Sequence, residues 1–291
     1  DRWQLLASLR TIDLGPLQKS EYQSVLVTAT RKTLATGALS HLQRLLTLRK
    51  AEASTLDWLL NVVLQAYDDE FAAFGWKTVE FLQQAGASAE RVLANPSNDF
   101  DSPCNFMLGS PERFRGLVER GLPVQTPLPV LGRPGIKVNA LTLFFMWRDP
   151  RSAVALNEEL GELLIQRATP QDFNTYNPAI KAFPLALAAR RSPKLARLMR
   201  KRGADANAQD AHGNTVLMME AASNEPATVR LLLEAGAEVN RTNKLGINAL
   251  GYAECFDAKE VVAILRSHSA KAEGAAGCRA AVERSQTRPQ P

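Results

Sequence analysis

The stretch RLLLEAGAEVN at residues 230–240 has the same layout as RLMRKRGADAN at residues 197–207. In both, an apolar run is followed by glycine, alanine, an acidic residue and, two positions later, asparagine. The interval between the two glycines, Gly203 and Gly236, recurs between Gly213 and Gly246. A fixed period of about 33 residues is typical of repeat solenoids, in which each unit buries its apolar face only against its neighbours. The sequence therefore predicts a stack of similar units.

Each unit is predicted to contain two short helices. Val229, Leu232 and Leu233 have the spacing of one face of a helix, which we expect to be the second of the pair. Gly236 follows that helix, where a left-handed cap favours glycine. Asn207 and Asn240 fall in the next loop, where a side-chain amide can bond backbone groups that no helix satisfies.

These features resemble the ankyrin repeat, whose pattern is Asp-x-x-Gly-x-Thr-Pro-Leu-His-x-Ala followed by Val-x-x-Leu-Leu-x-x-Gly-Ala-x-x-Asn. The matching positions are Asp210, Gly213, Thr215, Leu217, Val229, Leu232, Leu233, Gly236, Ala237 and Asn240. The Thr-Pro-Leu-His core is degraded to TVLM at 215–218 and to NALG at 248–251, and the resemblance weakens upstream of about residue 180. It implies an all-α fold, an ankyrin-type helix-pair solenoid with short hairpin or turn connections.

The second-helix pattern recurs upstream and sets the expected domain organisation. Segments 78–88, 115–125 and 161–173 carry it, and the units end at Gly86, Gly121 and Ala168. We expect a solenoid of about six helix pairs over residues 51–271, in one continuous stack without a second domain. Residues 1–50 are either a helical cap or a degenerate repeat. Residues 272–291, with small and charged side chains, are expected to be a frayed helix and tail.

Two insertions interrupt the period. Residues 122–138 contain four prolines and seven other apolar residues, so this segment either folds back on the array or forms a binding arm. Residues 65–76 are expected to lengthen a connection, and their aromatic residues, Tyr67, Phe71, Phe74 and Trp76, are expected to pack in the core.

Cysteine usage and hydropathy limit the class of protein. Cys104, Cys255 and Cys278 are widely spaced and odd in number, which argues against a disulfide framework and against a CxxC-type metal site. No apolar run approaches the ~20 residues of a membrane helix, so no transmembrane segment is expected. The chain starts at Asp1, which is compatible with removal of an export signal, so cytoplasm and periplasm both stay open.

The sequence lacks the patterns of an enzyme. His41, His212 and His268 belong to distant units, so they cannot assemble a nucleophile and its base. The acidic run DDE at 68–70 fits a solvated helix end better than a divalent-ion site. We therefore expect no catalysis, no cofactor and no bound metal.

A basic run covers one predicted helix pair. It consists of Arg190, Arg191, Lys194, Arg197, Arg200, Lys201 and Arg202, and no acidic residue occurs between Lys181 and Asp205. A solvated outer helix explains the run most simply, and an acidic protein partner is the main alternative. The sequence argues against nucleic acid as a partner, because aromatic residues that could stack on bases are absent nearby.

The resemblance implies a non-catalytic scaffold that binds another protein through its concave side and hairpin tips. At the tips it implies contacts by His212, Asn214, Lys244, Leu245 and Ile247. On the inner side it implies contacts by Arg190, Arg191, Ala222, Ser223, Cys255 and Phe256. Of these, Leu245, Ile247 and Phe256 are the apolar candidates for an anchor.

The degenerate, Ala/Arg/Leu-rich repeats of irregular length look bacterial and suit one dedicated partner. Similar bacterial proteins serve as inhibitors, so we expect an immunity protein that blocks a toxin or a lipase effector. Two alternatives remain. One is a general adaptor or host-directed effector, and the other is an adaptor for nucleic acid or anionic membrane that uses the basic residues between 190 and 202.

Overall fold

The structure is a computed structural model that describes residues 19–48, 51–66, 68–94, 111–130, 133, 135–146 and 157–286. The chain divides into two compact units, residues 1–135 and residues 136–291, and each is described by itself. Among the described residues, named strands are limited to β1 (Leu128–Pro129) and β2 (Lys137–Val138). The expected continuous stack across both units stays a prediction.

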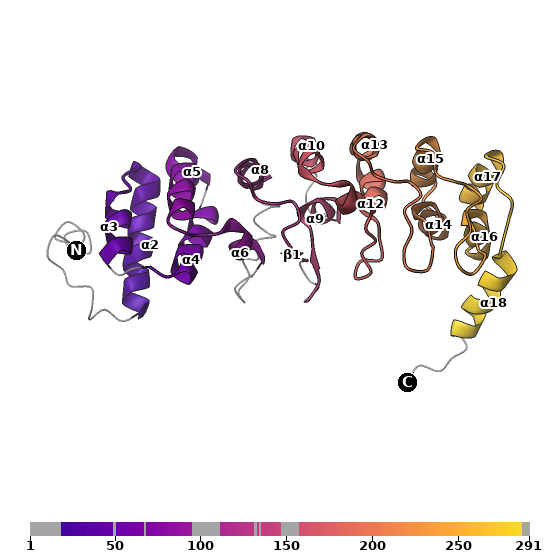
Figure 1. The fold of residues 1–291 in the computed structure, drawn as a ribbon, viewed down its shortest axis with the longest axis horizontal. Helices are drawn as coiled ribbons and strands as arrows, with labels where there is room; N and C mark the ends of the chain where they lie inside the picture. Colours follow the sequence, from indigo (N-terminus) through magenta and orange to yellow (C-terminus); the bar gives the residue numbers. More distant parts are fainter. Residues whose placement is uncertain are drawn as a thin grey trace. The chain divides into compact units, whose positions relative to one another are not determined.

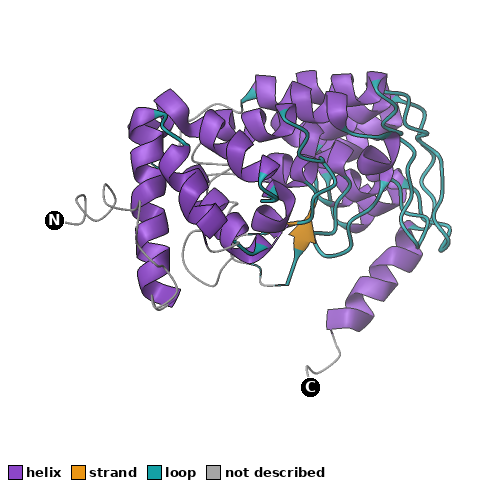
Figure 2. Cartoon of the chain, turned by 60° about the vertical axis from the view of Figure 1, so that its left-hand side comes forward, coloured by secondary structure: helices purple, strands orange, loops and turns teal. Residues whose placement is uncertain are grey.

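The second unit consists of helix pairs, as the sequence predicts (Figures 1 and 2). Its helices are α9 (Ala140–Met146), α10 (Glu158–Arg167), α11 (Pro170–Asn174), α12 (Pro184–Arg191), α13 (Pro193–Lys201), α14 (Val216–Ala222), α15 (Pro226–Glu234), α16 (Ala249–Cys255), α17 (Lys259–Ser267) and α18 (Ala275–Gln286). The first helices, α12, α14 and α16, form one row, and the second helices, α13, α15 and α17, form another. Hairpins connect successive pairs, with isolated antiparallel bridges Asn177–Ala182 and Gln209–Thr215.

The ends of the second helices confirm the predicted register. Gly203 and Gly236 follow α13 and α15 with φ angles of 103° and 85°, values that cost glycine little. Ser269 takes the same place after α17, with φ 60°. Ala168 after α10 is extended instead, which explains why alanine can replace glycine there.

The core of the second unit lies between the two rows of helices. Leu217 and Leu250 occupy equivalent positions on α14 and α16, and each is 1% exposed. Leu232 and Leu265, on α15 and α17, are fully buried. Thr215 caps the start of α14, where its hydroxyl accepts a hydrogen bond from the Met218 N–H. The all-α helix-pair solenoid predicted from the period is therefore confirmed.

The first unit is also helical. It contains α2 (Lys19–Thr36), α3 (Ser40–Leu48), α4 (Ala53–Leu64), α5 (Asp68–Gln84), α6 (Ala89–Ala94) and α8 (Pro111–Glu119), followed by β1. Helix α2 packs against α3, α4 and α5. Gly86 and Gly121 follow α5 and α8 with positive φ, as the sequence predicts. Helices α2 and α3 fit a helical cap and a degenerate repeat equally well, so both alternatives for residues 1–50 stay open.

The expected lengthened connection at residues 65–76 is wrong, because α5 already begins at Asp68. The aromatic residues of this segment therefore lie on a helix. Phe71 is buried and packs edge-on against Trp76, with 5.2 Å between the ring centroids. The guanidinium of Arg113 lies over the Phe71 ring at 4.4 Å. Core packing is confirmed for Phe71, whereas Tyr67 and the side chains of residues 68–70 lie outside the described part.

The proline-rich segment folds back on the first unit where it is described. Leu122, Val124, Thr126 and Leu128 are buried, and the residues between them are exposed. The segment makes a turn, in which the Thr126 N–H donates to the Pro123 carbonyl at 3.1 Å, and it keeps these alternate side chains against the core. The folded-back alternative is confirmed for residues 122–130, and residues 131, 132 and 134 lie outside the described part.

Candidate functional site

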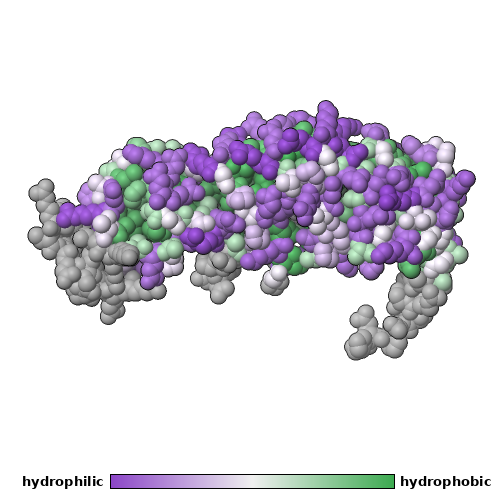
Figure 3. Space-filling view, viewed as in Figure 1, coloured by the Kyte–Doolittle hydropathy of each residue, from purple (hydrophilic) through white to green (hydrophobic). Residues whose placement is uncertain are grey.

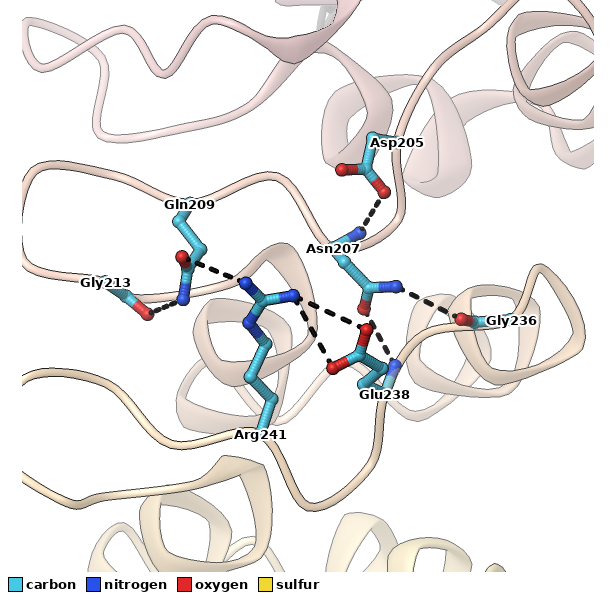
Figure 4. Close-up of polar contacts among 7 residues, drawn as sticks. All are labelled: Asp205, Asn207, Gln209, Gly213, Gly236, Glu238 and Arg241. Carbon is cyan, nitrogen blue, oxygen red and sulfur yellow. Dashed lines mark hydrogen bonds and ion pairs between the residues drawn. The ribbon is translucent and has the colours of Figure 1, made fainter.

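Asparagines at equivalent positions of successive repeats hold the base of each hairpin to the next unit. The Asn207 side chain donates to the Gly236 carbonyl at 3.3 Å and accepts from the Glu238 N–H at 2.8 Å (Figure 4). Asn174 and Asn240 make the same two bonds one unit earlier and one unit later. We call these three residues the asparagine ladder. The expected amide-to-backbone bonding is confirmed, but its partners lie in the following unit, and the sequence reading missed Asn174.

A second link joins the hairpins above the ladder. The Arg241 guanidinium reaches Gln209 in the preceding hairpin at 3.3 Å and Glu238 at 3.5 Å (Figure 4). Gln209 in turn donates to the Gly213 carbonyl at 2.9 Å, across its own hairpin. Consecutive hairpins are therefore cross-linked by side chains as well as by packing.

The tip at residues 210–214 is organised by one carboxylate. Asp210 accepts the N–H groups of His212 and Asn214 at 2.9 and 2.8 Å, and the Asn214 side-chain amide at 2.9 Å. The side-chain oxygen of Asn214 accepts from the Asn243 amide at 2.7 Å and from the Tyr252 hydroxyl at 3.1 Å. Of the two predicted contact residues here, His212 is exposed, and the Asn214 amide is used within the array.

The next tip contains the most exposed large hydrophobic residue of the described part. Leu245 is 77% exposed, and its N–H donates to Asn243 at 2.9 Å. Lys244 beside it is exposed, and its N–H donates to the His212 carbonyl of the preceding tip at 3.0 Å. Ile247 is only 6% exposed. Of the two predicted apolar anchors in this hairpin, Leu245 can reach a partner and Ile247 belongs to the core.

The other predicted contact residues lie at the carboxyl ends of the first helices of the repeats. Phe256, directly after α16, is 48% exposed and stacks on Tyr252, with 6.5 Å between centroids and 10° between planes. Ser223 occupies the corresponding place after α14 and is exposed, while Ala222 is half-buried. The last repeat therefore presents the largest apolar group of this row.

Arg190 is held by the neighbouring unit. Its guanidinium donates to both carboxylate oxygens of Glu220, at 2.8 and 3.0 Å, and Glu225 lies 3.8 Å away. Glu220 is 3% exposed, and this burial raises the pKa of its carboxyl, whereas Arg190 opposes the rise. Arg191 is half-buried. Arg190 thus compensates a buried charge, a role that the sequence reading missed.

The family described as "Ankyrin repeats (3 copies)" matches residues 152–243 and 185–275, the part that holds α10 to α17. Residues 152–275 are therefore ankyrin repeats. An ankyrin repeat-containing protein of Treponema pallidum (strain Nichols) is 32% identical over 34% of this chain and 33% of its own length. Ankyrin repeat and SOCS box protein 6 of Pongo abelii and of Homo sapiens is 37% identical over 40% of this chain and 30% of its own length. The chain thus spans about a third of the length of these curated relatives. Ankyrin repeats form protein–protein interaction scaffolds, typically without catalysis.

Basic side chains on the outer helices of the ankyrin repeats form ion pairs with acidic side chains of neighbouring repeats. Lys194 lies 2.8 Å from both Glu158 and Glu162, whose hydrogen bonds raise the pKa of its ammonium group. Arg197 pairs with Glu234 at 3.3 Å. These acids belong to neighbouring repeats, so the basic run looks isolated only along the chain. The surface over α10 and α13 is mainly hydrophilic (Figure 3), as expected for a solvated outer face.

The cysteine count argued against a disulfide framework, and it missed a single disulfide. Cys255 is bonded to Cys278, with 5.9 Å between the Cα atoms. The cysteine count missed it because residues 275–286, predicted as part of a frayed helix and tail, form helix α18, which packs against α16. Cys255, a predicted contact residue, is therefore part of a cross-link. Cys104 lies outside the described residues.

The described residues contain no group of three or more histidine, cysteine or acidic side chains that could hold a metal ion. In the same part of the chain, no helix combines the length and the apolar character needed to cross a membrane.

The asparagine ladder gives a first testable prediction. Asn207→Ala removes one donor and one acceptor bond to the next ankyrin repeat, and we expect the free energy of unfolding to fall by about 1–2 kcal/mol. Urea denaturation measures this change. Thr242→Ala, at an exposed hairpin position, is the matched control and should change stability by less than about 0.5 kcal/mol. Equal effects of the two variants would contradict a structural role for the ladder.

Proposed function

We propose that this protein binds one dedicated protein partner through the tips and inner helix ends of its last repeats, and inhibits that partner. One observation carries the proposal. Among the described residues, the exposed large hydrophobic side chains are Leu245 and Phe256, and both belong to the last repeat. Exposed apolar groups of this size are candidates for contact sites.

Hydrogen bonds and ring stacking connect these two residues within the repeat. Phe256 stacks on Tyr252, the Tyr252 hydroxyl lies 3.0 Å from the Asn243 amide, and Asn243 accepts the Leu245 N–H. A partner could therefore meet one pre-ordered surface instead of two loose groups. Pre-ordering lowers the entropic cost of association, which supports tight binding by a limited area.

The outer side offers less to a partner. Lys194, Arg197 and Arg230 there are paired with glutamates of adjacent repeats. These intramolecular pairs weaken the alternative of an adaptor that binds nucleic acid or anionic membrane. A phosphate-binding protein would also lose affinity steeply with added salt, whereas a shape-complementary inhibitor would lose much less.

The finer proposal is an immunity protein that blocks a bacterial toxin or lipase effector. Irregular repeat lengths and a degraded Thr-Pro-Leu-His core suit a single partner, and one similar protein is bacterial. A general adaptor or host-directed effector is the second candidate, supported by the ankyrin repeats alone. Co-purification of the chain with the product of the neighbouring gene, followed by an assay of that product's activity, separates the two.

We predict a clear order of effects on binding. Phe256→Ala should raise the dissociation rate about tenfold, because it truncates an apolar anchor at the inner side. Leu245→Ala should act in the same direction. Arg191→Glu should weaken binding more than Lys201→Glu, since Lys201 lies on the outer helix α13. Calorimetric titration and surface binding kinetics with the co-purified partner measure these changes.

Lys201→Glu is also the control that could overturn the proposed surface. If Lys201→Glu abolishes binding while Phe256→Ala and Leu245→Ala bind normally, the partner uses the outer basic face. The proposed site would then be wrong, and the adaptor alternative would be favoured.

A further inference from the structure

The C-terminal helix α18 is attached to the last ankyrin repeat by a covalent bond next to an exposed aromatic residue. The disulfide joins Cys255, the last residue of α16, to Cys278 in the first turns of α18. Phe256 follows Cys255 directly and is 48% exposed. We propose that this disulfide is a redox latch, which holds α18 against α16 when closed and releases it when reduced.

Hydrogen bonds hold residues 271–273, which precede Gly274 and α18, against the last repeats. The Asn248 side chain accepts from the Glu273 N–H, and the Asn248 N–H donates to the Glu273 carbonyl, both at 3.3 Å. Lys271 donates its N–H to Asn240 at 2.8 Å, as the last contact of the asparagine ladder. A side chain at Gly251 would collide with the Glu273 carbonyl, so glycine at that place lets this segment dock. Reduction of the disulfide would leave these contacts intact.

A pivot follows at Gly274. This residue has φ 76°, a conformation that glycine adopts at little cost, and α18 begins at the next residue. Everything after Gly274 can therefore change direction without disturbing the contacts of residues 271–273.

Helix α18 packs against α16, and its side chains are described over residues 275–280. In this stretch Cys278 is buried, and the other side chains that approach the array are the small, half-buried Ala275 and Ala280. Alanines bury little apolar area, so they contribute little hydrophobic stabilisation. The Arg279 guanidinium adds a hydrogen bond of 3.0 Å to the Glu254 carbonyl. Among the contacts of residues 275–280, the disulfide is the one covalent tie between α18 and α16, and Figure 1 shows α18 extending away from the rows of paired helices.

Release should also loosen the helix itself. A 12-residue helix without tertiary contacts is marginal in water. With α18 docked, the Cα atoms of the two cysteines are 5.9 Å apart, within the usual range for disulfides, so the docked position is compatible with the bond. The latch therefore links two states, a docked helix and a frayed arm, that differ next to Phe256.

The chemistry is a thiol–disulfide exchange. A dithiol reductant attacks one sulfur as a thiolate, the Cys255–Cys278 bond breaks, and the mixed disulfide is resolved by the second thiol of the reductant. Two electrons and two protons pass to the protein, which gains two thiols while the reductant becomes a disulfide. Closure runs in reverse, with a disulfide oxidant as acceptor.

The test uses the full chain alone and needs no partner. Amide hydrogen exchange is measured with and without dithiothreitol in a Cys104→Ser background, in which only the two latch cysteines can respond. After reduction we expect exchange at residues 277–286 to become at least about tenfold faster, while α16 and α17 keep their protection. Cys278→Ala should show the fast exchange without reductant, and Ser267→Ala on α17 serves as the matched control.

Two outcomes would overturn the latch. One is a non-reduced protein in which both latch cysteines react with a thiol reagent after denaturation, since the disulfide would then be absent. The other is equal protection of α18 in both redox states, since packing alone would then hold the helix. An effect of reduction on partner affinity rests on the proposed function and is measured separately, so a missing partner would leave the exchange result decisive.

Discussion

Leu232→Ala is expected to lower the free energy of unfolding by about 2–5 kcal/mol. Leu232 is fully buried on α15, which packs against both α12 and α17, so the lost methyl groups leave a cavity shared by neighbouring ankyrin repeats. Because repeat stability depends on interfaces between neighbours, the loss should weaken more than one repeat. Leu217→Ala on α14 should have a similar cost. Urea denaturation followed by circular dichroism measures both changes.

Leu245→Ala is the control for this prediction. It makes the same chemical change at a position that is 77% exposed, and we expect a stability change below about 0.5 kcal/mol. If Leu232→Ala and Leu217→Ala were both as mild as Leu245→Ala, the assignment of buried positions to the repeat period would be wrong.

Arg190→Ala is the second change with a large expected effect. It leaves Glu220, 3% exposed, without its bidentate partner. Removing one member of a buried ion pair costs roughly 3–5 kcal/mol. We expect about 3 kcal/mol, at the lower end of that range, because the Arg190 side chain is itself 36% exposed. Thermal or urea denaturation at pH 7.5 measures the loss.

The stability lost in Arg190→Ala should depend on pH, because the loss comes from the ionised carboxylate of Glu220. Burial already raises the pKa of Glu220, and without Arg190 the pKa should rise further. A carboxyl whose pKa is higher in the folded than in the unfolded state destabilises the fold above the folded pKa, and the cost disappears as the pH falls to about 4.5. The difference between Arg190→Ala and the unmodified chain should therefore shrink from pH 7.5 towards pH 4.5.

Two variants test this explanation. Arg230→Ala breaks an exposed pair with Glu260 and should cost less than about 1 kcal/mol, with little pH dependence. Adding Glu220→Gln to Arg190→Ala should restore part of the stability at pH 7.5, because the buried group is then neutral. A pH-independent loss without such rescue would show that Arg190 stabilises the array by packing alone.

The fold could be predicted because the repeat period is defined by residues that are close in sequence. The glycines at 203 and 236 and the leucines at 217, 232, 250 and 265 all occupy the places that the repeat requires. Residues 65–76 were misread because a helix start inside a run of acidic and aromatic residues carries no periodic signal of its own. The alternation at 122–128 shows in the sequence, but which face is buried depends on what the segment packs against.

The candidate site was less predictable, because partners there come from different repeats. The cations between 190 and 202 look like an unpaired basic patch until the neighbouring repeats bring Glu158, Glu220 and Glu234 beside them. Likewise, Asn214 and Ile247 occupy tip positions in the family pattern, yet one is engaged by Asn243 and the other is buried. A comparison of residues separated by one repeat length could have found several of these contacts.

The asparagine ladder has a consequence for how such a chain can change in length. Each asparagine bonds to backbone groups 29 and 31 residues further on, and the three asparagines are themselves one repeat length apart. Deleting residues 204–236 as a block would join Gly203 to Ala237. Asn174 would keep the Gly203 carbonyl 29 positions further on, and the Glu238 N–H would replace that of Asp205 31 positions further on. Inserting a single residue between an asparagine and the end of the next second helix would break both bonds. The array can therefore gain or lose whole repeats far more easily than single residues.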